Sequence, residues 1–156
     1  MMWRLLLWVA VMFLCSCAPV AERAEVAPAP SFSIDELAVR AQALPGAQVE
    51  KNGGLQIHYP GETLFAAGSI LPLARGEELL EPLADFLKSS EDRPWQVHVH
   101  AATALGEAYD QRLADKRLEL LQRYLQRRGV AVDGFDWQSS AGREAPLIVR
   151  LPAATP

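Results

Sequence analysis

The spacing of apolar residues divides the chain into three parts. Residues 5–14 form an unbroken apolar run, and residues 18–31 show no apolar period. From residue 33 onward the sequence alternates between periods typical of helices and of strands. The run at 5–14 is shorter than the about 20 residues that span a bilayer. We therefore expect one folded domain that begins after residue 31.

Helical spacing predicts two helices in the first half of this domain. The segment 33–44 begins with Ser33 and has Glu36 three residues later, which is a capping-box pattern. A second helix covers roughly residues 74–89. Pro82 lies inside it, and an interior proline costs about 3 kcal/mol. We therefore expect this helix either to kink or to begin late.

The longest helix is predicted from about Glu107 to Arg128. Its apolar face consists of Leu113, Leu120, Leu121 and Tyr124. Gly129 follows at the position where helices commonly end in a left-handed conformation, and Val130 supplies the apolar contact after it. This end of the helix is therefore well defined by the sequence.

Alternation of apolar and polar residues predicts the strands. Asn52-Gly53 lies between two short alternating runs and is a strong signal for a hairpin. The predicted strands are residues 47–50, 55–59, 95–100, 135–139 and 147–151, with 135–139 as a core strand. The order of elements predicts an α+β fold, a two-layer sandwich with a mixed four-stranded sheet and helices on one face.

The first 17 residues indicate export. Arg4 precedes the apolar run, as in a secretory signal peptide. The end of the run, Leu14-Cys15-Ser16-Cys17, resembles a bacterial lipobox, which implies cleavage before Cys17 and attachment of lipid to its thiol. We therefore divide the chain into a signal peptide at 1–16, a lipidated cysteine with an Ala- and Pro-rich linker at 17–31, and a domain at 32–156.

This interpretation also predicts where the protein resides. No cysteine follows Cys17, so the mature domain is expected to fold without disulfides. Ala18 follows the lipidated cysteine, whereas an aspartate there retains enterobacterial-type lipoproteins at the inner membrane. The resemblance therefore implies an anchor in the outer membrane with the domain in the periplasm. An extended linker of this length reaches about 45 Å.

Composition and motifs exclude several functions. Without Arg4, 14 lysine and arginine residues stand against 19 acidic ones, a net charge of −5. A mildly acidic domain is a poor candidate for binding nucleic acid. No nucleophile elbow, phosphate-binding loop, dinucleotide-binding glycine pattern or metalloprotease helix is present. We therefore expect a protein that is not an enzyme and holds no cofactor.

Three histidines raise the alternative of a metal site. His98 and His100 alternate with valines, so their side chains share one face of the sheet. His58 lies on an earlier strand, and zinc or copper binding requires the two strands to be neighbours. The other interpretation is a solvated outer face of the sheet, which we favour because no cysteine or acid spacing supports a metal.

Three strings of the sequence carry a resemblance to a known family. They are Leu64-Phe-Ala-Ala-Gly-Ser69, Tyr109-Asp-Gln-Arg-Leu-Ala-Asp-Lys-Arg117 and Arg128-Gly-Val130. The first is similar to Leu-Phe-x-x-x-Ser, the second to Tyr-Asn-x-x-Leu-Ser-x-x-Arg and the third to the usual helix end of the OmpA-like periplasmic domain of Pal-type lipoproteins and MotB-type stators. The resemblance covers about residues 47–151.

The resemblance implies a site for the diaminopimelate side chain of peptidoglycan. In the family an arginine on the long helix takes the ligand carboxylate, and an aspartate after the second strand takes its ammonium group. Arg117 stands at the arginine position, and Thr103 and Asp110 are the accompanying candidates. Ala104 stands where the aspartate belongs, so we expect weak diaminopimelate binding and partial restoration by Ala104→Asp.

Two functions are compatible with a matching arginine and a missing aspartate. The first is an outer-membrane lipoprotein that associates with peptidoglycan and links membrane to wall. The second is a degenerate OmpA-like domain that serves as a scaffold for envelope proteins in a secretion, pilus or motility apparatus. For Arg117 the alternative to a ligand role is an exposed arginine whose stem covers neighbouring leucines on the helix.

Overall fold

The structure, a computed structural model, describes residues 32–153. The predicted signal peptide, Cys17 and the linker lie outside the described residues. The described elements, in chain order, are α1 (Ile34–Gln42), β1 (Gln48–Glu50), β2 (Gly54–Tyr59), α2 (Ala74–Lys88), β3 (Gln96–Ala101), α3 (Glu107–Arg127), the short 3-10 helix η1 (Val132–Gly134), β4 (Asp136–Ala141) and β5 (Leu147–Pro152).

The five strands form one mixed sheet in the order β1-β2-β5-β3-β4. The pair β3–β4 is parallel, and the other pairs are antiparallel. The predicted α+β class and mixed sheet are confirmed. The sheet has five strands and not the predicted four, because the short predicted strand at 47–50 also joins it as β1, paired with β2 across the Asn52-Gly53 turn. The predicted core strand β4 is instead an edge strand that pairs with β3 alone.

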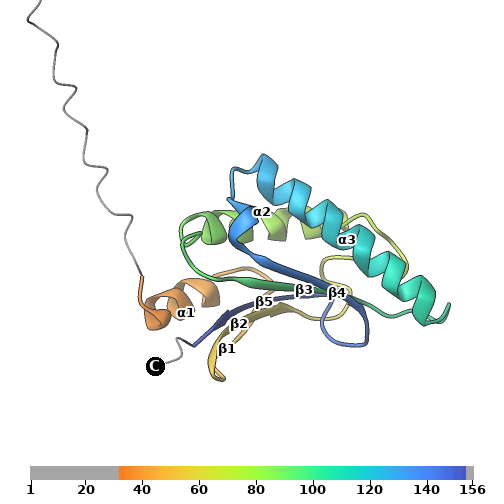
Figure 1. Ribbon diagram of the computed structural model, residues 1–156, viewed down its shortest axis with the longest axis horizontal. Coiled ribbons are helices and arrows are strands. Elements are labelled where there is room, and N and C mark those ends of the chain that lie inside the picture. Colours follow the sequence, from red (N-terminus) through yellow and green to blue (C-terminus); the bar gives the residue numbers. More distant parts are fainter. Residues whose placement is uncertain (1–31, 154–156) are drawn as a thin grey trace, which may run out of the picture.

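The helices α2 and α3 cover one face of the sheet, and no helix of residues 32–153 lies over the opposite face (Figure 1). Alternate side chains of the strands enter the core beneath these helices, as the alternation predicted. Trp95, Leu147 and Ile57 are fully buried there together with Leu37 of α1. Within residues 32–153 no helix is long and apolar enough to cross a membrane.

The helix ends follow the sequence signals closely. In α3 the N–H of Gly129 donates to Gln126 O and the N–H of Val130 donates to Leu125 O, which is a Schellman motif. Gly129 adopts a φ of 80°, as expected for a glycine at this position. The helix α2 begins at Ala74 and continues through Pro82, so the late start offered as one alternative is wrong.

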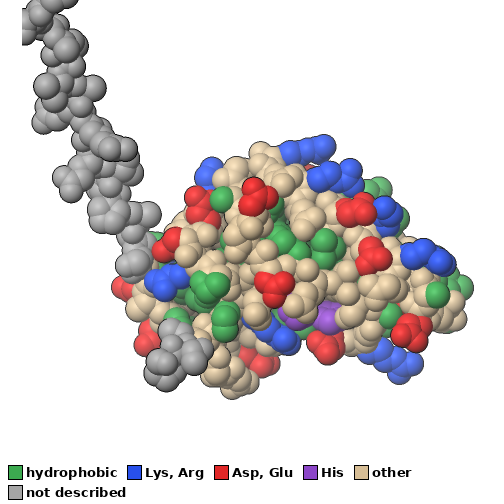
Figure 2. Space-filling model, viewed as in Figure 1, with side chains coloured by type: hydrophobic (Ala, Val, Ile, Leu, Met, Phe, Trp, Pro, Cys, Tyr) green, Lys and Arg blue, Asp and Glu red, His purple; other side chains and the backbone are tan. Residues whose placement is uncertain are grey.

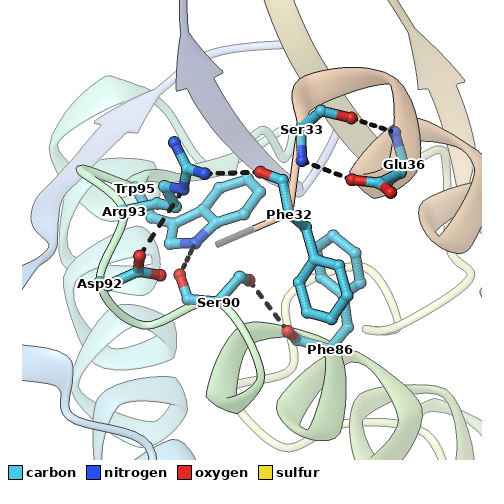
Figure 3. Close-up of polar contacts among 8 residues, drawn as sticks. All are labelled: Phe32, Ser33, Glu36, Phe86, Ser90, Asp92, Arg93 and Trp95. Atoms are coloured by element: carbon cyan, nitrogen blue, oxygen red, sulfur yellow. Dashed lines mark hydrogen bonds and ion pairs between the residues drawn. The ribbon is translucent and has the colours of Figure 1, made fainter. Parts of the chain in front are cut away.

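The start of the domain is fixed to the loop between α2 and β3 (Figure 3). The Arg93 guanidinium donates to the carbonyl of Phe32, and the Trp95 indole N–H donates to Ser90 O at 2.9 Å. The predicted capping box of Ser33 and Glu36 is present at the start of α1. The described chain therefore begins at a defined point on the domain, beside α1.

Candidate ligand-binding site

Arg117 is buried at the end of the sheet where α3 crosses β3. Only 4% of its surface is exposed, so the alternative of an exposed helix arginine is wrong. Its Nε donates to Ser69 O at 2.8 Å, its Nη2 to Ala66 O at 3.0 Å and its Nη1 to His100 O at 3.4 Å. Within residues 32–153 no carboxylate lies within ion-pair distance of this guanidinium.

Burial lowers the pKa of Arg117, because the charged form loses contact with water. The guanidinium carbon lies 4.6 Å from the centre of the Phe65 ring, within reach of a cation–π interaction. Arginine nevertheless remains protonated in proteins. The side chain is therefore a cation held by neutral carbonyls and one aromatic ring.

The segment 64–73 that surrounds Arg117 is held in place by α2. The N–H of Leu73 donates to Leu64 O at 2.8 Å, and Phe65 pairs with Pro72 as an isolated bridge. A Cβ at Gly76 would lie 2.5 Å from Leu64 O, so glycine is needed for this approach of helix to segment. The carbonyls that receive Arg117 are thereby fixed before a ligand arrives.

Arg117 lines a cavity of about 660 Å³ at this end of the molecule. One part of its wall is formed by residues within 60–67, and another part by the loop 142–146 between β4 and β5. The buried side chains of Ile148 and His100 contribute to it from the helix-free face of the sheet. The charged residues that line it are Glu50, Glu62, Arg117, Arg143, Glu144 and Arg150, three of each sign.

Thr103 and Asp110 lie outside the set of residues that line this cavity. The Thr103 hydroxyl donates to Asp110 Oδ1 at 2.6 Å, and this bond lowers the pKa of the carboxyl. Both residues are thereby engaged with each other at the start of α3. Ala104 is exposed and also does not line the cavity, which argues against restoration of binding by Ala104→Asp.

Sequence reasoning missed a polar cluster of His100, Ser140 and Glu144 beside the cavity. His100 is 7% exposed, and its Nδ1 lies 2.9 Å from Ser140 Oγ. Its Nε2 has no hydrogen-bond partner among the described residues, and Glu144 Oε2 lies 3.4 Å away. Burial lowers the pKa of His100, whereas the charge of Glu144 opposes this shift. No local signal in the sequence links Glu144, in a loop, to a histidine 44 residues earlier.

The three histidines do share the helix-free face. Figure 2 shows histidine atoms (purple) at the surface beside acidic and basic side chains. They do not converge, because β5 lies between β2 and β3 and places Ile148 between His58 and His98. Two strand spacings separate β2 from β3 by about 9–10 Å. Among residues 32–153 no group of three histidine, cysteine or acidic residues is arranged to hold a metal ion.

The sequence matches no protein-family model and no curated protein. Solved structures do resemble the chain. The cell wall anchor of the T6SS from Pseudomonas aeruginosa has a TM-score of 0.57 and 15% identity over 78% of this chain and 97% of its own. A MotB-like protein from Desulfovibrio vulgaris has a TM-score of 0.60 and 12% identity over 79% of this chain and 90% of its own.

A third structure carries the family's name. The OmpA-like domain of FopA1 from Francisella tularensis has a TM-score of 0.52 and 17% identity, and the match covers 68% of this chain and 80% of that one. All three identities are below the level at which likeness extends beyond architecture. The similarity and the order of elements establish that residues 32–153 have the fold of an OmpA-like domain.

Proposed function

We propose that this chain is a lipoprotein of the outer membrane that binds the stem peptide of peptidoglycan and so links membrane to wall. Lipid on Cys17 is the anchor, and the cavity beside Arg117 is the ligand site. The observation that carries the proposal is the guanidinium of Arg117, which is buried at the cavity without a carboxylate partner in the described chain. The protein acts by binding and performs no catalysis.

The chemistry of Arg117 suits a carboxylate ligand. Of its five N–H groups, three donate to backbone carbonyls and two have no partner among the described residues. A carboxylate accepts two parallel N–H bonds from a guanidinium, and such charge-assisted bonds are about twice as strong as neutral ones. The free carboxyl of diaminopimelate supplies this group. The T6SS structure above is described as a cell wall anchor, which agrees with this function.

Sedimentation with purified peptidoglycan sacculi tests the binding. The mature chain with Cys17→Ser, which needs no detergent, is expected to sediment with sacculi that carry free diaminopimelate. It is expected to remain in solution with sacculi in which that carboxyl is amidated, because the amide removes the charge that Arg117 receives. Equal sedimentation with both kinds of sacculi contradicts a carboxylate site at Arg117.

Metabolic labelling tests the anchor separately. Wild-type protein is expected to incorporate labelled palmitate and to float with outer membranes in a density gradient. Cys17→Ser is expected to abolish both and to leave an uncleaved precursor. Lipid incorporation by this variant places the anchor at another residue and leaves the proposed binding site unaffected.

The alternative is a scaffold in an envelope assembly that does not bind diaminopimelate. It is favoured by the loop 102–106, which contains no acid, and by the apolar side chains of Leu71 and Leu105, which are 66% and 68% exposed. Under this alternative neither kind of sacculus retains the mature chain. Cross-linking in cells then recovers envelope proteins through residues placed near Leu71 and Leu105.

A further inference from the structure

The cavity beside Arg117 has balanced charge, and this constrains its ligand. Three arginines and three glutamates line it, so the cavity offers partners for both a carboxylate and an ammonium group. A ligand that carries both a carboxylate and an ammonium group matches both. The fixed cation for the carboxylate is Arg117, and the remaining question is which carboxylate receives the ammonium group.

Glu50 and Glu62 are the less suitable acceptors. The Oε2 of Glu50 accepts from Nδ2 of Asn52 at 3.2 Å. The Oε1 of Glu62 accepts the N–H of Ala67 at 3.2 Å, so this side chain is occupied in holding the segment that leads to Arg117. It projects from the wall formed by residues 60–67, the same wall that supplies the Arg117 carbonyl partner Ala66. Its carboxylate therefore has a structural role already.

Glu144 is free to bind a cation. Its side chain is 63% exposed, and its contact with His100 is the only ion-pair contact that it makes among the described residues. It lies on the loop 142–146, which also lines the cavity. Arg117 and Glu144 both approach His100, the former at its carbonyl and the latter at its ring. Both groups therefore lie near the end of β3.

The imidazole of His100 adds a second acceptor beside Glu144. With a proton on Nδ1 that is donated to Ser140 Oγ, the lone pair of Nε2 faces Glu144 Oε2 across 3.4 Å. In this tautomer two acceptors face each other, and an ammonium group that donates to both relieves their repulsion. The Nε2 of this side chain, which is more than nine-tenths buried, has no hydrogen-bond partner among the described residues, and in this tautomer the partner that it lacks is a donor.

We propose that Glu144 and Nε2 of His100 together receive the ammonium group of a zwitterionic amino-acid end whose carboxylate lies on Arg117. The loop between β4 and β5 thereby supplies the acid that the loop between β3 and α3 lacks. This inference rests on the proposed function, because it names the second half of the same ligand site. The ammonium group donates one N–H to the carboxylate and one to the imidazole.

Calorimetric titration with a soluble muropeptide that contains diaminopimelate tests the inference. The protein is the mature chain with Cys17→Ser. Adding Glu144→Gln is expected to weaken binding about tenfold, an estimate reduced for the exposure of this side chain. Glu77→Gln is the matched control, since it alters an exposed acid on α2 that does not line the cavity, and it is expected to change the affinity less than about twofold.

A second ligand isolates the contact. Acetylation of the diaminopimelate amine removes the positive charge and is expected to weaken binding to the unsubstituted domain by the same factor of about ten. Glu144→Gln is then expected to cause no additional loss, because both changes remove one interaction. Circular dichroism of each variant verifies that the fold is retained.

The outcomes separate this inference from the function on which it rests. If the unsubstituted domain binds the muropeptide and Glu144→Gln binds it equally well, the acceptor is wrong and the proposed function stands. If Glu144→Gln weakens both the free and the acetylated ligand alike, the effect is indirect and the acceptor is also wrong. If the unsubstituted domain does not bind the muropeptide, both proposals fail.

Discussion

The hydroxyl of Thr103 donates a hydrogen bond of 2.6 Å to Asp110, and this bond joins the loop after β3 to the first turn of α3. The bond lowers the pKa of Asp110, so it stabilises the fold above the unfolded pKa of about 3.9. The stabilisation is lost as the pH falls through the folded pKa. The pair therefore holds the start of the helix.

Thr103→Val tests this assignment. The variant keeps the shape of the side chain and removes the donor, so we expect a lower thermal midpoint at pH 7 and a shallower loss of stability on acidification. Thr63→Val is the control, because the Thr63 hydroxyl donates to the carbonyl of Pro60 and not to a carboxylate. The control is expected to leave the acid dependence unchanged. An unchanged acid dependence in Thr103→Val contradicts the proposed bond.

Arg117 is expected to contribute to stability as well as to binding. Arg117→Lys replaces a planar group that reaches three carbonyls by a single ammonium group that cannot reach them in the same directions. We expect the free energy of unfolding to fall by about 2 kcal/mol in urea denaturation. Arg112→Lys, at an exposed position of the same helix, is expected to stay within about 0.5 kcal/mol of wild type.

The local spacing of apolar residues was sufficient to predict the helices and strands, but not to predict which strands pair. Alternation at residues 55–59 predicted the buried face of β2 correctly, because side-chain direction in a strand is a local property. The insertion of β5 between β2 and β3 is a long-range choice that no local pattern encodes. For this reason the sequence predicted the sheet face on which His58 lies, but not its distance from His98.

The site shows the same division. A motif on one helix pointed to Arg117 as a site residue. The burial of Arg117 depends on the carbonyls of Ala66 and Ser69, and these lie in a segment whose apolar residues show no regular spacing. The approach of Glu144 to His100 depends on the course of a loop, and loop geometry is not readable from composition. Alignment to a motif gave Ala104 a place at the ligand, which stays a prediction, and the structure adds only that Ala104 does not line the cavity beside Arg117.

Trp95 and Trp137 offer a matched pair for the core. The Trp95 ring is fully buried and donates to Ser90 O at 2.9 Å, whereas Trp137 is partly buried and donates to Val132 O at 3.0 Å. Trp95→Phe leaves a buried carbonyl unpaired and a cavity beside Phe86, so we expect a loss of about 3 kcal/mol in the free energy of unfolding. Trp137→Phe loses the same kind of bond near solvent and is expected to cost about half as much. Equal losses of unfolding free energy in the two variants contradict the deeper burial of Trp95.

The helix-free face is expected to make stability depend on pH near neutrality. Burial lowers the pKa of His98 and His100, the charge of Arg150 adds to this, and the charges of Asp136 and Glu144 oppose it. Because the folded pKa values lie below the unfolded value of about 6.5, the unfolded chain binds more protons as the pH falls. The free energy of unfolding should therefore decrease from about pH 7 to pH 5.

Replacement of both histidines checks this dependence. The double variant His98→Gln/His100→Gln is expected to flatten the decrease between about pH 7 and pH 5, measured by urea denaturation at several pH values. The further loss at lower pH, where Asp110 and Asp115 are protonated, is expected to remain. If the free energy of unfolding of the double variant falls between pH 7 and pH 5 as steeply as that of wild type, groups other than these two histidines cause the dependence.

Ala104→Asp distinguishes the motif from the geometry. If the ligand met the loop 102–106 as the resemblance implies, a new carboxylate there would raise the affinity for a diaminopimelate muropeptide about thirtyfold. Ala104 is exposed and does not line the cavity, whereas Glu144 does, so we expect the affinity to change less than about twofold. Calorimetric titration of Ala104→Asp beside Glu144→Gln makes the comparison within one assay. A large gain in Ala104→Asp with no loss in Glu144→Gln moves the ammonium site to the β3–α3 loop.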